Sequence, residues 1–158
     1  MRILILFLSL ALIPANNNAQ KRNLPEIEAH FFALIVKDMD ASISWYSENL
    51  GFEIINLNEY PKAGFKQANL KRGNNRIELI ELKSALSPDT AIPDYDGKTR
   101  LIGFFKMGFS VSNFDVFIEH LNENKVKFHG TIVVNEETKK RMVIVKDPDE
   151  NRIQLFEN

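Results

Sequence analysis

The sequence contains no cysteine, only three histidines and one tryptophan among its 158 residues. Without cysteine there is no disulfide scaffold, no thiolate zinc site and no cysteine nucleophile. A charge excess of one sign is also missing, because 20 Lys and Arg stand against 21 Asp and Glu, for a net charge of −1. Nucleic-acid-binding proteins usually carry a basic patch, so we expect no nucleic-acid partner. The length suits one domain that buries a core without covalent cross-links.

The sequence also lacks an apolar run long enough to cross a bilayer, which takes roughly 20 residues. Its N-terminus has Arg2, an apolar run over residues 3–13, and then Ala19, a small residue suited to peptidase cleavage. This order is typical of a secretory signal peptide over 1–19. We therefore predict cleavage near Ala19, a flexible segment over 20–27, a secreted or periplasmic location and no stable membrane anchor. The alternative is that the apolar run forms a buried element of the fold.

The rest of the sequence repeats itself. Residues 75–82 (NRIELIEL) recur as residues 151–158 (NRIQLFEN), with five of the eight positions identical. The apolar pattern of residues 33–40 recurs over 108–115, at nearly the same offset. Two matches in the same order indicate a duplicated structural unit, which decides the architecture before any motif is considered.

The duplication predicts one domain over 28–158. Its first module covers 28–82 and its second covers 104–158, with a proline-containing linker over 83–103. Apolar alternation, helical spacing and turn residues predict the order β-α-β-β-β in each module. The expected strands cover 30–36, 52–58, 65–71 and 75–82 in the first module, and 105–111, 126–134, 141–146 and 151–157 in the second.

One helix is expected after the first strand of each module. Asp38 or Asp40 can cap the first helix, and Gly51 can end it. Asn113 can cap the second helix.

Three segments of these modules resemble a known family. They are residues 36–46 (VKDMDASISWY), 50–52 (LGF) and 147–155 (DPDENRIQL). Together they resemble the vicinal oxygen chelate (VOC) superfamily of glyoxalases, bleomycin-resistance proteins and extradiol dioxygenases. The resemblance implies an α+β fold in which two tandem βαβββ modules form a curled mixed sheet around a central cavity. This fold hosts many chemistries, so the side chains in the cavity must indicate the function.

The family usually has glycine where this sequence has Glu150. Glycine adopts a left-handed backbone freely, whereas another residue does so at a cost of about 1 kcal/mol. We therefore expect an altered turn at this position and an unaltered fold.

Side chains alternate between the two faces of a strand, so each strand divides its residues between the helix and the cavity. Ile77, Leu79, Ile153 and Leu155 are expected on the helix face. The candidate ligand-binding residues on the cavity face are Phe31, Arg76, Glu78, Lys106, Ser110, Arg152, Gln154 and Phe156.

The family resemblance also implies where a metal would bind. Metal-dependent members carry His or Glu ligands at four positions, which here are Phe31, Glu78, Lys106 and Gln154. Only Glu78 is an ordinary metal ligand, because Phe has no donor atom and Lys is a cation. We therefore predict no metal and no other cofactor. The alternative is a divalent metal held after a β-bulge turns His30 toward the cavity.

These observations favour a secreted or periplasmic protein that binds a small molecule without a metal, similar to bleomycin-resistance proteins. A metal-dependent glyoxalase, epimerase or dioxygenase-type enzyme is the first alternative. In a metal-free lyase or isomerase, Glu78 would be the base and Lys106 would stabilise an oxyanion. The same two residues could instead form an interior ion pair. A non-catalytic interaction module is a further alternative, and a homodimer is plausible because such modules can pair across chains.

Overall fold

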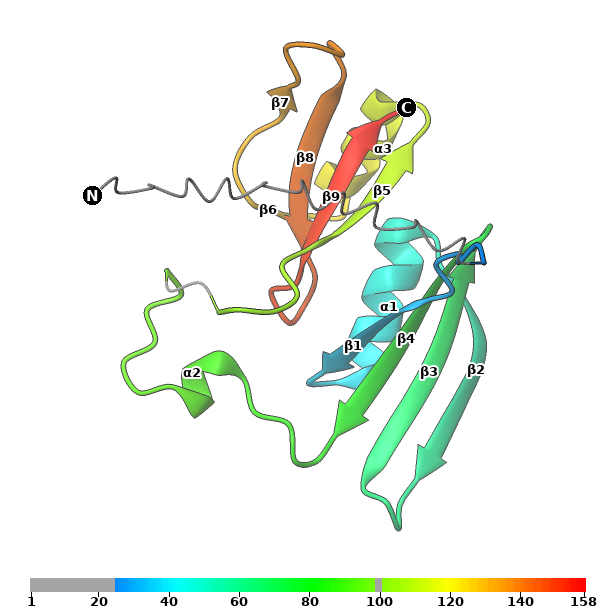
Figure 1. The fold of residues 1–158 in the computed structure, drawn as a ribbon, viewed down its shortest axis with the longest axis vertical. Coiled ribbons are helices and arrows are strands. Elements are labelled where there is room, and N and C mark those ends of the chain that lie inside the picture. Colours follow the sequence, from blue (N-terminus) through cyan, green and yellow to red (C-terminus); the bar gives the residue numbers. More distant parts are fainter. Residues whose placement is uncertain (1–24, 99–100) are drawn as a thin grey trace, which may run out of the picture.

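The computed structural model describes residues 25–98 and 101–158 (Figure 1). The predicted signal peptide over 1–19 lies outside these residues and stays a prediction. Within the described ranges, no helix is both long and apolar enough to span a membrane.

Two modules with the same order of elements follow one another along the chain, and a linker with one short helix joins them (Figure 1). The elements are β1 (Phe32–Val36), α1 (Met39–Leu50), β2 (Glu53–Tyr60), β3 (Phe65–Arg72), β4 (Asn75–Leu82), α2 (Pro88–Ala91), β5 (Met107–Val111), α3 (Phe114–Glu123), β6 (Lys127–Phe128), β7 (Val133–Val134), β8 (Arg141–Lys146) and β9 (Arg152–Glu157).

Each module forms its own mixed sheet. The first sheet has the order β1-β4-β3-β2, and the second has the order β5-β9-β8-β6, with β7 also paired to β8. The first strand of each module is parallel to the last, whereas the remaining pairs are antiparallel. The predicted α+β fold of two βαβββ modules is confirmed. The two sheets curl, but they do not close on one another.

Several predicted strand boundaries were wrong, among them the end of β2, which continues to Tyr60 rather than stopping at residue 58. β1 begins at Phe32, which is paired with Ile77 of β4, rather than at residue 30. β5 likewise begins at Met107 rather than at residue 105. The single strand expected over 126–134 is divided into β6 and β7, and Gly130, with a left-handed φ of 88°, lies between them.

The expected division of strand residues between two faces is confirmed for the helix side. Ile77, Leu79, Ile153 and Leu155 are each at most 1 % exposed. They pack with buried residues of α1 and α3, including Tyr46 and Leu121, in one apolar core shared by both modules. Burying such side chains contributes roughly 1.5–3 kcal/mol each, so the helix faces hold the molecule together and leave the opposite faces free for function.

The ends of α1 follow the sequence prediction. The Asp38 carboxylate accepts a hydrogen bond of 2.9 Å from the backbone N–H of Ala41, and Gly51 ends the helix with a φ of 62°. For α3 the predicted cap residue was right in position only. Asn113 directly precedes the helix, but its side chain makes no capping hydrogen bond. Glu150 has a φ of 66°, so it adopts the left-handed backbone that glycine adopts freely, and its backbone is not altered as the sequence led us to expect.

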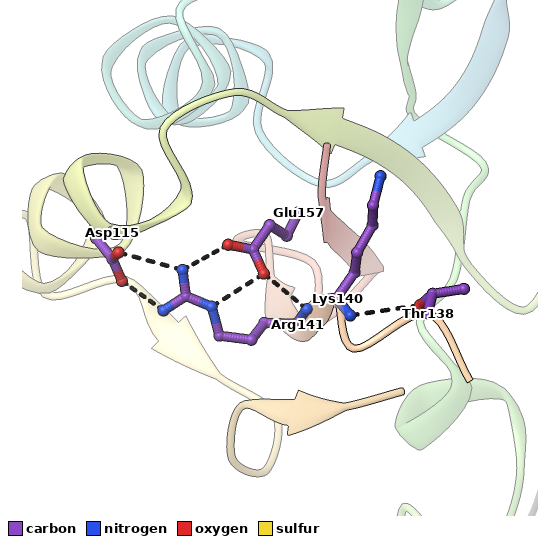
Figure 2. Close-up of polar contacts among 5 residues, drawn as sticks. All are labelled: Asp115, Thr138, Lys140, Arg141 and Glu157. Atoms are coloured by element: carbon purple, nitrogen blue, oxygen red, sulfur yellow. Dashed lines mark hydrogen bonds and ion pairs between the residues drawn. The ribbon is translucent and has the colours of Figure 1, made fainter. Parts of the chain in front are cut away.

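A polar cluster around Arg141 fastens α3 to the second sheet (Figure 2). Its guanidinium donates to both oxygens of Asp115, at 2.6 and 3.1 Å, and to both oxygens of Glu157, at 2.6 and 3.0 Å. The bidentate pair lowers the pKa of Glu157 to about 2 and also lowers the pKa of Asp115. Because the charges of Arg141, Asp115 and Glu157 are paired with one another within the module, the cluster is structural.

Candidate functional site

Each sheet has one face covered by a helix and one open face. On the first sheet Ile35 is 56 % exposed, and on the second sheet Phe156 is 39 % exposed. Helix α1 covers the first sheet and also contacts the second module, where the Tyr46 hydroxyl donates to Asp147 at 2.8 Å. The open face of the first sheet therefore points away from the second module (Figure 1).

This arrangement divides the predicted cavity residues into two sets. Phe31, Arg76 and Glu78 belong to the first sheet and the segment before it. Lys106, Ser110, Arg152, Gln154 and Phe156 belong to the second sheet and the segment before it.

A cavity of about 250 Å³ lies on the open face of the first sheet. It brings Phe31 and Arg76 together, as the sequence predicted. The lining residues are His30, Phe31, Ile55, Asn56, Asn69 and Arg76.

His30 lines the same cavity, so the expectation that only a β-bulge would turn it toward the cavity was wrong. The two rings are in edge contact, with centroids 5.7 Å apart. Both residues precede β1, and alternation therefore does not separate their side chains. No bulge is needed to bring His30 to this face.

Glu78 lies beside this cavity in β4, where its carboxylate accepts a hydrogen bond from the Gln67 side chain. Its neighbour across the strand pair is Asn69, whose amide donates to Asn56 at 2.9 Å. Sequence reasoning missed Gln67, Asn56 and Asn69 as site residues. The alternation of polar residues along β3 was the signal that could have found them.

The open face of the second sheet carries a different set of charges. Lys106 donates to the side-chain oxygen of Gln154, and the Gln154 amide in turn contacts the Met142 sulfur at 2.9 Å. The Phe105 ring lies between two cations, with Lys106 Nζ 5.8 Å and the Arg152 guanidinium 4.9 Å from its centroid. This face is therefore positively charged and aromatic.

Three predicted residues lie differently from the expectation of one shared cavity. Ser110 lines a separate cavity between the modules. Glu78 and Lys106, predicted as a catalytic pair, are each hydrogen-bonded within their own sheet and do not meet within one chain.

The donor set at the family's metal positions does not suit a divalent cation. Lys106 places an ammonium group on the Gln154 oxygen, and Glu78 is the only carboxylate of the four. Within residues 25–98 and 101–158, no group of three or more His, Asp or Glu side chains lies close enough to hold a metal ion.

Comparison with known proteins agrees with this architecture. The model of the Glyoxalase/Bleomycin resistance protein/Dioxygenase superfamily matches residues 28–155. The chain therefore belongs to this superfamily.

Relatives of similar length have been recorded. The protein YaeR of Escherichia coli (strain K12) is 28% identical over 130 residues, which cover 82% of this chain and 95% of that protein. YwkD of Bacillus subtilis (strain 168) is 26% identical over 128 residues, which cover 81% of this chain and 94% of that protein. The crystal structure of a glyoxalase family protein from Enterococcus faecalis matches with a TM-score of 0.68 and 26% identity, covering 82% of this chain and 96% of that chain.

Proposed function

We propose that this protein binds a small organic anion, without a metal, in a cup that is completed by a second copy of the chain. The observation that carries the proposal is the 250 Å³ cavity of the first open face, where Arg76 lies beside two asparagines and an aromatic ring. Two apolar side chains and four polar or charged ones line this cavity, so it combines an apolar wall with the convergent polar groups that orient a small-molecule ligand.

The lining of the cavity restricts the ligand. The Arg76 guanidinium can bind a carboxylate or phosphate through two parallel hydrogen bonds. Phe31 and Ile55 offer an apolar surface to the body of the ligand. Glu78, held by Gln67, would accept a hydrogen bond from a ligand hydroxyl or amine beside the anionic group.

The proposal of a second copy of the chain rests on the open faces of the two sheets. Apolar side chains are exposed on both, with Ile35 at 56 % and Phe105 at 55 %. The first face carries Glu78 beside the cation Arg76, whereas the second carries Lys106 and Arg152. Placing the first face of one copy over the second face of another would bury the apolar side chains and bring Glu78 opposite the cations of the second face. A two-fold axis would then form two equivalent cups.

A binding experiment on the protein purified after export tests the ligand class. Thermal-shift screening of small carboxylates and phosphates should give hits, and calorimetry should then measure their affinity. Arg76→Gln should weaken binding at least tenfold, because a bidentate charged contact is lost. The matched control Lys62→Gln, in the exposed turn between β2 and β3, should bind as the natural protein does. Equal affinity in both variants would contradict the site.

Metal analysis and mass measurement test the other parts of the proposal. The exported protein should contain no stoichiometric divalent metal, and its N-terminus should lie near Gln20. A metal that is lost on His30→Ala or Glu78→Gln substitution would favour the enzyme alternative. An N-terminus that retains residues 1–19 would contradict export by signal-peptide cleavage.

A further inference from the structure

The two modules meet at two places that the duplication makes equivalent. At the closed junction, the turn of residues 147–151 between β8 and β9 contacts α1 of the first module. At the open junction, the turn of residues 72–75 between β3 and β4 lies beside α3 of the second module. The two turns differ in length and in side chains, and this difference decides what each junction can hold.

Two carboxylates fill the closed junction. Asp147 accepts hydrogen bonds from the Tyr46 hydroxyl at 2.8 Å, the Asn151 amide at 2.9 Å and two backbone N–H groups of its own turn. The Asp149 carboxylate accepts the backbone N–H of Lys37, at 3.2 Å from each oxygen. Asp147 is only 4 % exposed. The side chains of one turn thus bind directly to the other module.

Strand register identifies the equivalent positions. Leu70 is paired with Ile77, and Val145 is paired with Ile153. Arg72 therefore corresponds to Asp147, since each lies two residues further along. By the same rule Ser112, directly after β5, corresponds to Lys37, directly after β1.

The turn at the open junction lacks the carboxylates. Gly73 and Asn74 separate Arg72 from Asn75, whereas three residues separate Asp147 from Asn151. The first turn is therefore one residue shorter. A Cβ atom added to Gly73 would meet no atom within 4 Å, so the space is empty next to the turn.

A cavity of about 370 Å³ occupies the open junction. Its polar lining consists of Arg72, Asn75, Ser110 and Ser112, and its aromatic lining of Phe52, Phe109 and Phe117. The guanidinium of Arg72 donates to the Leu50 carbonyl at 2.7 Å and lies 5.4 Å from the centroid of the Phe117 ring. A fixed cation therefore stands beside an apolar, aromatic wall.

We propose that the open junction is a second binding site, which takes a small carboxylate with an aromatic body. The carboxylate of the ligand would replace the one that Asp149 supplies at the closed junction. Its donors would be Arg72 and the backbone N–H of Ser112, the equivalent of the Lys37 N–H that Asp149 binds. The aromatic body would pack against the edge-to-face pair of Phe52 and Phe109, whose ring centroids are 5.9 Å apart. This site is independent of the cavity that contains Arg76.

Calorimetric titration of the whole protein with phenylacetate tests this site. Saturable binding is expected, and phenylacetamide, which has the same shape without the charge, should bind at least tenfold more weakly. Arg72→Gln should also weaken phenylacetate binding at least tenfold. The proposed cup also takes small carboxylates, and Arg76→Gln removes its guanidinium. Phenylacetate binding that the Arg76→Gln variant retains is therefore assigned to the open junction, so that failure of this site and failure of the proposed cup are distinguishable.

Glycine variants give a second, independent comparison. Gly73→Asp should place a carboxylate inside the cavity and lower phenylacetate affinity at least tenfold. Gly64→Asp is the matched control, because Gly64 also has a left-handed φ and lies in the turn between β2 and β3. Urea unfolding of both variants shows whether they remain folded. Absence of phenylacetate binding, equal affinity in Gly73→Asp and natural protein, or loss of binding in Arg76→Gln would each overturn the proposal.

Discussion

The closed and open junctions show how a duplicated module acquires two different uses. Both join a β-hairpin turn of one module to the helix of the other. At the closed junction Asp147 and Asp149 reach across the interface, whereas at the open junction a shorter turn leaves a cavity beside Arg72. The two turns differ in length by one residue. The longer turn makes a contact that holds the modules together, whereas the shorter turn leaves a cavity in which we propose that a ligand binds.

The largest expected effect comes from breaking the closed junction. Asp147→Ala removes the acceptor for Tyr46, Asn151 and two backbone N–H groups, all of which stay buried or partly buried. Unpaired buried polar groups are costly, so the free energy of unfolding should fall by about 3 kcal/mol. Urea denaturation measures this. A loss as small as that of Arg72→Gln would mean that the two junctions are energetically alike.

A smaller effect is expected when only one hydrogen bond of the closed junction is removed. Tyr46→Phe keeps the ring in the core but takes the donor from Asp147. We expect a loss of about 1–3 kcal/mol, since a buried carboxylate loses one partner. The double variant Tyr46→Phe with Asp147→Asn should be less destabilised than the sum of its single variants, because the two side chains interact directly. Additive losses would contradict their coupling.

The pH dependence of stability should distinguish the contribution of the closed junction from that of the Arg141 cluster. Arg141 lowers the pKa of Glu157 to about 2, so the stability that Glu157 contributes is present above its ordinary pKa of about 4.3 and is lost as the pH falls toward 2. Burial raises the pKa of Asp147, so its contribution has the opposite sign and is lost as the pH rises through that raised pKa.

Melting temperature as a function of pH measures this difference. Between pH 5 and pH 2, roughly the range of these groups, Glu157→Gln should lose less stability than the natural protein. Glu59→Gln, an exposed position in β2, is the matched control and should follow the natural protein. Parallel curves for Glu157→Gln and the natural protein would show that the Arg141 cluster does not act through Glu157.

The smallest effect on stability is expected at the open junction. Arg72→Gln removes the hydrogen bond to the Leu50 carbonyl and the contact with the Phe117 ring. Both contacts are near the surface, so the loss should be under about 1 kcal/mol in urea denaturation. A loss as large as that of Tyr46→Phe would show that Arg72 is a structural residue rather than a binding group.

The sequence predicted the elements of the fold better than their assembly. Internal repetition and strand alternation correctly placed Ile77 and Ile153 in the core, because both signals are local to a module or a strand. They contain no information on how one module is placed against the other. Glu78 and Lys106 were therefore assigned to one cavity, although they lie on separate sheets.

The contacts of the closed junction could not be predicted from local sequence patterns either. Residues 147–151 have the composition of a solvent-exposed turn, and nothing nearby in the sequence shows that Tyr46 lies against Asp147. Long-range pairing of this kind depends on tertiary structure. The error at His30 has a different cause, since the rule of strand alternation was applied to a residue that precedes the strand.

Cross-linking between chains tests most directly whether two copies complete the cup. Because the chain has no cysteine, a single introduced cysteine is the only thiol in each variant. A Glu78→Cys chain mixed with a Lys106→Cys chain should give a covalent dimer with a short bismaleimide, whereas replacing Glu78→Cys by Lys62→Cys should give none. Absence of the dimer in the first mixture, or equal yields in both mixtures, would contradict the account.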